Sequence, residues 1–372
     1  MIPHLTKYGK TILDQVHHKF PLKLPPRLVL ITDLDHTLLG VSANESMEQA
    51  QANLQVDFFI SIKNKYAPNN SILVYATGRS MTRYEMATKE YPNLLKPDIL
   101  ICKDGVEIFW FNKHLAQLVQ EKPVPGFGNS IFYFYFFFNY CYEMKFDNGT
   151  EPHQFLWLDR GWDATLQADW NQEFAESLHH EWKQNHKLAA LPAGSDFLEP
   201  FRIAVMTFTM EEAISAQEFF LKRVEEYNLQ IEKELNAMSP LQRKKSTKHP
   251  MKIHAFYCIE RASNNWWACI CPAHAGKGCA VEWIRKRLHH KNGENFVVCG
   301  DSGNDISMLS LPNYHAVIVR NCSRELQDYY EAHGELKGQY MYLTKANRTH
   351  GVMEGLEYFG HRISKSWTIS EN

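Results

Sequence analysis

The chain has 372 residues, 44% apolar and 22% charged, a usage typical of a soluble globular protein with one large domain or two ordinary ones. Its 40 basic and 42 acidic residues leave a net charge of -2, which gives no electrostatic reason to expect nucleic acid or an anionic membrane as partner. Residues 1–26 lack the apolar core of a signal peptide, and the longest apolar block, 131–138, is about half of the roughly 20 residues that a spanning helix requires. We therefore expect a cytoplasmic protein.

A short apolar segment, residues 28–31, comes just before two carboxylates, Asp33 and Asp35. Such a run, flanked by prolines and a glycine turn, is typical of a central parallel strand covered by helices on both faces. Ligands of open parallel sheets bind beyond the carboxyl ends of the strands, where both aspartates fall. Because two unpaired carboxylates repel each other, the pair indicates a cation that both share. The alternative is that one aspartate caps the following turn and the other is simply exposed.

The following elements alternate between helix and strand. Apolar spacing predicts a helix, a strand, a helix and a strand, in that order, at residues 46–66, 72–76, 81–90 and 99–102. The second strand of the chain ends at Thr77, Gly78 and Arg79. This order predicts an α/β fold in which three strand ends meet at one edge of a sheet.

The alternation breaks at about residues 121–150. This segment contains prolines, glycines and the aromatic block 132–138, without a helical or a strand period. Two interpretations stay open: a pair of strands inserted between domains, or an insertion that packs poorly. We favour the second.

Residues 155–257 have the pattern of a second unit. Trp157, Trp162, Trp170 and Trp182 indicate an aromatic-rich helix. A strand and a helix with an acidic start follow at residues 202–208 and 210–227. The basic run at residues 242–249 has no interleaved aromatic side chains, so we expect a solvated loop there rather than a nucleic-acid contact.

The first pattern then resumes with a helix from Lys277 to residue 291 and a strand at residues 296–299, which ends in the acidic loop 300–305. Further strands and a last helix are predicted at residues 315–319, at 340–343 and from about Gly351 onward. A core domain is therefore interrupted by an inserted one. The expected limits are 27–115 and 272–362 for the core, 116–271 for the insertion and 1–26 for an N-terminal extension.

The cysteines give little reason to expect a disulfide framework, since eight are scattered through a long chain. Cys269, Cys271, His274 and Cys279 form the one cluster, but its spacing differs from the C-x-x-C of structural zinc sites. We favour ordinary thiols over a zinc site.

Together the strand ends supply the groups that phosphoryl transfer through a carboxylate requires. Asp33 is the predicted nucleophile and would form an aspartyl phosphate. Asp35 is the predicted acid and base, which protonates the leaving oxygen and then takes a proton from water. Thr77 and the Gly78 amide can donate hydrogen bonds to the phosphoryl oxygens.

A carboxylate that attacks a phosphate meets charge repulsion, so the site needs positive charge. We expect Mg²⁺ held by Asp33, the main-chain oxygen of Asp35 and Asp301, together with the Lys277 ammonium. Asp305 and Asn304 would orient this shell.

These segments resemble the four motifs of the haloacid dehalogenase superfamily of phosphatases. The motifs are Asp33-Leu-Asp35-His-Thr37, Thr77-Gly78-Arg79, Lys277 and Gly300-Asp-Ser-Gly-Asn-Asp305. The closer resemblance is to the sucrose-phosphate phosphatase branch, through residues 161–163, 275–278, 300–305 and 344–355. It covers roughly residues 28–360, apart from about thirty residues around the aromatic block.

The resemblance implies a Rossmann-like parallel-sheet core domain with an inserted α/β cap, a Mg²⁺ cofactor and hydrolysis of sucrose 6-phosphate to sucrose and phosphate. It also implies that Arg79 and Asn304 contact the phosphate or the substrate, that Asp35 and Asp305 belong to the metal site, and that Arg202 lies near the sugar. It further implies that the protein could associate with a sucrose-phosphate synthase.

Two segments differ from the family pattern: residues 130–144 have no counterpart, and residues 102–105 replace a Ser/Thr-rich turn. One alternative is a phosphatase of the same cap class for mannosyl-3-phosphoglycerate or glucosylglycerol phosphate. Another is a catalytically silent partner of the synthase, which would require the loss of catalytic groups that this chain retains.

Overall fold

The computed structural model describes residues 28–40, 71–91, 94–111, 115–116, 157–185, 196–246, 248–260 and 265–365. The chain divides into two compact units, one formed by the residues up to Asp159 and from Lys277 onward, the other by Arg160–Gly276. The domain limits expected at residues 116 and 271 remain a prediction. The expected helix at 46–66, the aromatic segment at 121–150 and the extension at 1–26 lie outside the described residues.

The first unit is built on an eight-stranded sheet in the order β12-β11-β10-β1-β2-β3-β4-β5. Its strands are β1 (Leu28–Thr32), β2 (Ser71–Ala76), β3 (Ile99–Cys102), β4 (Glu107–Trp110), β5 (Trp157–Leu158), β10 (Phe296–Gly300), β11 (His315–Ile318) and β12 (Met341–Leu343). The strands from β12 to β3 are parallel, and β4 and β5 are antiparallel. The predicted α/β fold with a parallel core sheet is confirmed.

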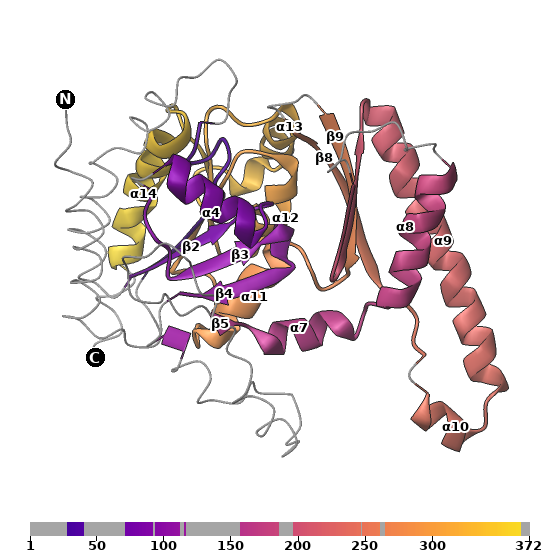
Figure 1. Ribbon diagram of the computed structural model, residues 1–372. Coiled ribbons are helices and arrows are strands. Elements are labelled where there is room, and N and C mark those ends of the chain that lie inside the picture. The colour runs from indigo at the N-terminus through magenta and orange to yellow at the C-terminus, as the bar shows by residue number, and fades with distance from the viewer. Residues whose placement is uncertain are drawn as a thin grey trace, which may run out of the picture. The chain divides into compact units, whose positions relative to one another are not determined.

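β1 lies between β10 and β2, and all five of its residues are buried. A strand without a polar face is stable only where both sides of the sheet are covered. Figure 1 shows α4 and α14 among the helices around this sheet. The unit's α-helices are α4 (Met81–Glu90), α11 (Lys277–Arg287), α12 (Ile306–Leu309), α13 (Arg324–Ala332) and α14 (Arg348–Lys365), with 3₁₀ helices η3 (Lys103–Gly105), η5 (Gly303–Asp305) and η6 (Gly334–Leu336). The apolar opening segment is therefore the centre of the core.

The second unit has a four-stranded antiparallel sheet in the order β6-β7-β9-β8. Its elements are α7 (Arg160–Gln167), α8 (Gln172–Asn185), β6 (Asp196–Glu199), β7 (Arg202–Thr207), α9 (Met210–Ala237), α10 (Pro240–Lys245), β8 (Ile253–Glu260) and β9 (Asn265–Pro272). Helix α9 packs against β7, β8 and β9, and Figure 1 shows α8 and α9 together on one side of the sheet. One face of this sheet is thereby covered, as antiparallel sheets require.

Three expectations for the second unit need correction. The single aromatic-rich helix is in fact strand β5 and two helices, α7 and α8. Helix α9 continues to Ala237, beyond the expected end at residue 227. The solvated loop expected at residues 242–249 begins as helix α10, because Ser239 caps its N-terminus and Pro240 occupies the first turn.

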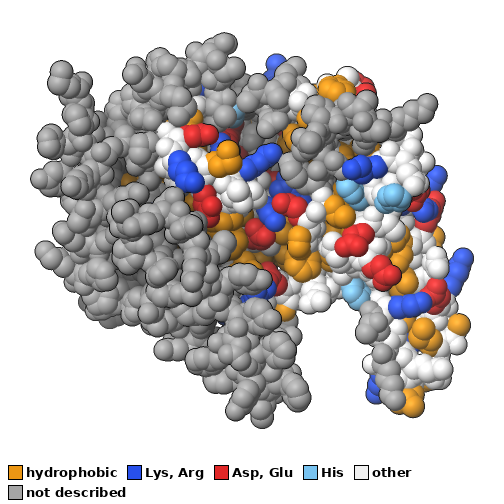
Figure 2. All heavy atoms as spheres, viewed as in Figure 1, with side chains coloured by type: hydrophobic (Ala, Val, Ile, Leu, Met, Phe, Trp, Pro, Cys, Tyr) orange, Lys and Arg blue, Asp and Glu red, His pale blue; other side chains and the backbone are white. Residues whose placement is uncertain are grey.

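Charged side chains of both signs lie on the described part of the face that Figure 2 shows, with acidic and basic groups interspersed. Among the described residues, none of the helices combines the length and the apolar character needed to cross a bilayer.

Candidate active site

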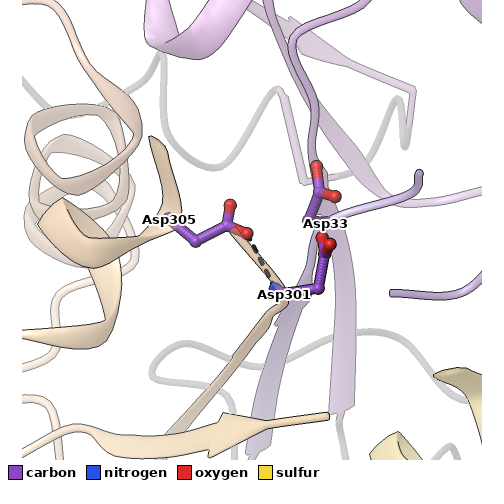
Figure 3. A group of neighbouring side chains, drawn as sticks. All are labelled: Asp33, Asp301 and Asp305. Carbon is purple, nitrogen blue, oxygen red and sulfur yellow. Dashed lines mark hydrogen bonds between the residues drawn. The ribbon is translucent and has the colours of Figure 1, made fainter. Parts of the chain in front are cut away.

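Two adjacent strands deliver the central carboxylates. Asp33 directly follows β1, and Asp301 directly follows β10, its parallel neighbour. The Asp33 amide donates to the Cys299 carbonyl at 3.0 Å, which continues the pairing of the two strands to their ends. Because parallel strands end at the same edge of a sheet, the two side chains lie next to each other, as Figure 3 shows.

The loop after β10 is closed by Asp305. Its Oδ2 accepts hydrogen bonds from the amides of Asp301 at 2.9 Å and Ser302 at 3.1 Å, the first drawn in Figure 3. A Cβ on Gly300 would lie 2.6 Å from the Asp305 side chain, so this close approach requires glycine. Thr37 donates from Oγ1 to Asp301 Oδ1 at 3.0 Å and thereby links the loop after β1 to the same carboxylate.

Lys277, at the start of α11, connects these groups. Its Nζ donates to Asp33 Oδ1 and to Asp305 Oδ1, both at 2.7 Å, and the residue is only 1% exposed. Burial by itself would lower the pKa of Lys277, but the negative charges of Asp305 and Asp33 outweigh burial and raise it above its ordinary value. The side chain is therefore an ammonium fixed between two carboxylates.

The same burial acts on Asp33 in the opposite sense. Removal from water raises the pKa of Asp33 well above its ordinary value; the charge of Lys277 opposes this rise, and Asp305 and Asp301 add to it. Ionisation of Asp33 therefore depends on positive charge at the site.

The three aspartates Asp33, Asp301 and Asp305 have ligand oxygens within 4.8 Å of one another. They are the one group among the described residues in which three or more such ligand atoms come this close. Oxygen ligands suit hard divalent cations, and three carboxylates beside the Lys277 ammonium leave negative charge that such a cation would balance. The residues present therefore fit a hard divalent cation. The cysteine cluster around Cys269 does not form a comparable group among the described residues.

The Asp35 side chain does not join these carboxylates. Its Oδ2 accepts from Arg79 Nε at 2.8 Å and its Oδ1 from Arg79 Nη2 at 2.6 Å. This two-point pairing holds the predicted acid and base against the loop that follows β2. Only its main-chain oxygen is left as the predicted contact to a cation.

The loop after β2 is stabilised by a hydrogen bond between its backbone and the Thr77 side chain. The Thr77 hydroxyl is fully buried and accepts from the Arg79 amide at 3.1 Å. A hydroxyl that accepts one hydrogen bond can still donate its own hydrogen. Gly78 lies between these two residues, and the absence of a side chain there lets an anion approach the backbone closely.

Asn304 is held at both ends of its amide. Its Nδ2 donates to Asp104 Oδ1 at 3.0 Å, and its Oδ1 accepts from Ser302 Oγ at 2.7 Å. Thr37, Ser302 and Asp104 were not among the predicted site residues. Thr37 and Ser302 lie within the family motifs, whereas Asp104 belongs to the segment 102–105 that departs from the family pattern.

Arg202 lies in the second unit, at the start of β7. Ile203 and Val205 belong to the apolar core that β7 shares with α8 and α9. Since side chains alternate along a strand, Arg202 lies on the opposite face of the sheet. The predicted contact of Arg202 with the substrate remains a prediction.

Comparison with known proteins places these motifs in context. The sequence pattern of the family described as Sucrose-6F-phosphate phosphohydrolase matches residues 26–121 and 226–360, more than half of the chain. Sucrose-phosphatase 1 of Nicotiana tabacum is 26% identical over 337 residues, which are 90% of this chain and 59% of the relative. A mannosylfructose-phosphate phosphatase of Agrobacterium fabrum is 36% identical over 91 residues, 24% of this chain and 34% of the relative.

Among solved structures, the sucrose-phosphatase of Synechocystis sp. PCC6803, in complex with sucrose and phosphate, has a TM-score of 0.54 at 17% identity. The match covers 90% of this chain and 98% of that one, and it concerns the fold. The chain spans less than two thirds of the length of the curated plant relatives that it matches.

Proposed function

The chain belongs to the sucrose-6F-phosphate phosphohydrolase family, and from this premise we propose that it hydrolyses sucrose 6-phosphate to sucrose and inorganic phosphate. The observation that carries the proposal is the buried arrangement of Asp33, Lys277 and Asp305, with Asp301 beside them. Burial of so much charge at the end of a central strand is costly for stability, and its most direct explanation is a catalytic one.

In the proposed reaction, an Asp33 carboxylate oxygen attacks the phosphorus, and the bond from phosphorus to the sugar oxygen breaks. Asp33 then carries an aspartyl phosphate, and the sugar leaves as an alcohol once its oxygen has received a proton from Asp35. A water molecule attacks the aspartyl phosphate and gives a proton to Asp35, which releases inorganic phosphate and restores both aspartates. Lys277 holds Asp33 in place and compensates its charge.

Asp35 must take up a proton from solvent and exchange partners before this proton transfer. Both of its oxygens accept hydrogen bonds from Arg79, so one of them has to turn to the leaving oxygen. Arg79 then becomes available to the phosphoryl oxygens, for which a guanidinium offers matched donors. With this exchange, Arg79 can pair with Asp35 before the substrate binds and still have the substrate-binding role predicted for it. Thr77, Gly78 and Asn304 complete the proposed phosphate site.

We propose Mg²⁺ as the cation, held by Asp33, Asp301 and the main-chain oxygen of Asp35, with Asp305 orienting the loop. When bound, Mg²⁺ neutralises negative charge on the phosphoryl oxygens and on the carboxylates. The hydrogen bonds from the Asp301 and Ser302 amides to Asp305 support its orienting role.

The choice of sugar is the finer part of the proposal. Sucrose 6-phosphate is supported by the family and by the plant relatives, and the mannosylfructose-phosphate phosphatase makes another disaccharide phosphate the second candidate. Arg202 is the proposed sugar contact in the second unit. A cytoplasmic location and association with a sucrose-phosphate synthase also remain predictions.

The test is phosphate release from a panel of sugar phosphates, measured with MgCl₂ and with EDTA. The panel contains sucrose 6-phosphate, mannosylfructose phosphate, mannosyl-3-phosphoglycerate, glucosylglycerol phosphate and glucose 6-phosphate. We expect the highest kcat/KM for sucrose 6-phosphate and loss of turnover in EDTA. A kcat/KM for sucrose 6-phosphate no better than that for glucose 6-phosphate would refute the substrate, and activity in EDTA would refute the metal.

A further inference from the structure

The turn after β3 has an unusual backbone. Lys103, Asp104 and Gly105 have φ angles of 53°, 55° and 98°. Residues other than glycine seldom adopt this left-handed backbone conformation, and neighbouring residues seldom adopt it together. Backbone strain of this kind persists only where the surroundings enforce it, and it concentrates at functional sites.

The surroundings that enforce this turn belong to the loop after β2. The Lys103 amide donates to the Arg79 carbonyl at 2.9 Å, and the Asp104 amide donates to the Thr77 carbonyl at 3.1 Å. The two hydrogen bonds fasten the loop on either side of Gly78. The strained turn therefore fixes the backbone that is proposed to bind phosphate.

The Asp104 side chain makes a second connection from the same position. It is 6% exposed, and its Oδ1 accepts the Nδ2 hydrogen of Asn304 at 3.0 Å. A Cβ on Gly78 would lie 3.1 Å and 3.3 Å from its two oxygens, so the carboxylate packs directly against the glycine. Its negative charge also raises the pKa of Lys277, after the larger effects of burial, which lowers it, and of Asp305 and Asp33. One buried carboxylate thus contacts the loops that follow β2 and β10.

We propose that Asp104 is a positioning residue of this phosphatase: it holds the Asn304 amide and the Gly78 loop in the arrangement that binds the phosphoryl group. The inference rests on the proposed function, but none of the four family motifs includes Asp104. It acts through Asn304 and Gly78, which are the groups proposed to contact the phosphate.

Two substitutions separate the carboxylate from the turn. Asp104→Gly removes the side chain and suits the left-handed backbone, so the protein should fold. Asp104→Asn keeps an acceptor for Asn304 and tolerates the left-handed conformation, but it removes the charge. The matched control is Asp98→Ala, because Asp98 is also 6% exposed and its Oδ2 accepts the Leu73 amide at 3.0 Å, within the core sheet.

We expect Asp104→Gly to lower kcat by about 10- to 100-fold, the usual cost of losing a group that orients a site. Asp104→Asn should restore kcat to within a few fold of wild type, and Asp98→Ala should leave kcat unchanged even if it lowers the melting temperature. The double variant with Asn304→Ala should lose less than the product of the two single losses, since Asp104 acts through Asn304.

A second readout separates this inference from the proposed function. Isothermal titration with inorganic phosphate and MgCl₂ should show binding weakened by about tenfold in Asp104→Gly and close to wild type in Asp104→Asn. If the wild type hydrolyses none of the sugar phosphates, the proposed function fails, and phosphate binding still tests the inference. Equal losses in the Gly and Asn variants, or a loss in Asp104→Gly no larger than in Asp98→Ala, would overturn it.

Discussion

The two units place their charges differently. In the first, the Lys277 side chain is 0% exposed and its partners Asp33 and Asp305 are 7% and 0% exposed. In the second, Arg223 pairs with Glu181 at 35% and 36% exposure, while the core consists of apolar and aromatic groups such as Trp182 and Phe220. Half-exposed ion pairs contribute little to stability, whereas buried ones are costly to form and more costly to break.

The difference identifies the site independently of any motif. Both units combine a sheet with helices, so the architecture alone does not distinguish them. Buried charge at strand ends occurs where parallel strands β1 and β10 stop together. A sheet of antiparallel strands has no edge at which all carboxyl ends collect, and the core cluster beside the second unit's sheet is apolar and aromatic. The following substitutions test this contrast.

The largest effect is expected for the nucleophile. Asp33→Asn should lower kcat by at least about 10⁴-fold, because an amide cannot replace the attacking carboxylate. Asp169→Asn is the matched change in the second unit, where the buried Asp169 contacts His274, and it should leave kcat near the wild-type value. The measurement is single-turnover phosphate release, with circular dichroism to verify folding. Wild-type turnover by the Asp33 variant would remove it as nucleophile.

Replacing one ion-paired basic side chain in each unit should lower the free energy of unfolding by very different amounts. Lys277→Met leaves Asp33 and Asp305 buried without their ammonium and should lower the free energy of unfolding by about 3–5 kcal/mol. Arg223→Met should cost about 0.5 kcal/mol, because its partners reach water. Urea unfolding in EDTA provides both values. Similar costs for the two variants would contradict the contrast in burial.

A smaller, kinetic effect tests the role of the second unit. Arg202→Ala should raise KM for sucrose 6-phosphate by about tenfold, the value of one hydrogen bond from a charged group, with kcat little changed. Arg223→Ala is the control, because its guanidinium pairs with Glu181 and Glu226. An unchanged KM in the Arg202 variant would exclude its contact with the sugar.

The smallest effect concerns a carboxylate of the first unit outside the site. Burial would raise the pKa of Glu354, but hydrogen bonds from Tyr342 and from the amides of Lys345 and Ala346 outweigh it and lower the pKa below 4.5. A carboxylate whose pKa is lowered by folding stabilises the fold at pH values above its ordinary pKa. This contribution disappears as the pH falls through the lowered pKa.

Glu354→Gln should therefore lower the free energy of unfolding slightly at pH 7, by at most about 0.5 kcal/mol because water screens the site, and progressively less below pH 4.5. Glu331→Gln is the control, since the Glu331 side chain is 61% exposed and pairs with Lys337. Urea midpoints at several pH values provide the comparison, and a cost independent of pH would contradict the assignment.

The sequence predicted the α/β core and brought forward Asp33, Asp301, Asp305 and Lys277 as one group. This was possible because apolar runs end at these acids or just before the loop that holds them, and parallel strands end at a common edge. The strands of the second unit were harder: β8 and β9 were not predicted. Aromatic residues occupy both faces of these strands, which obscures a two-residue period.

From the sequence alone, the motifs indicated the family by their resemblance to it, and the strand ends brought forward the candidate carboxylates of the site. Only the tertiary structure decided how neighbouring polar groups pair: Arg79 with Asp35 across 44 residues, and Asn304 with Asp104 across 200. No local pattern encodes such pairs, because each depends on where two separate loops end in space. The strained turn at Asp104 exists because it satisfies the carbonyls of Thr77 and Arg79, which the chain brings beside it only when folded.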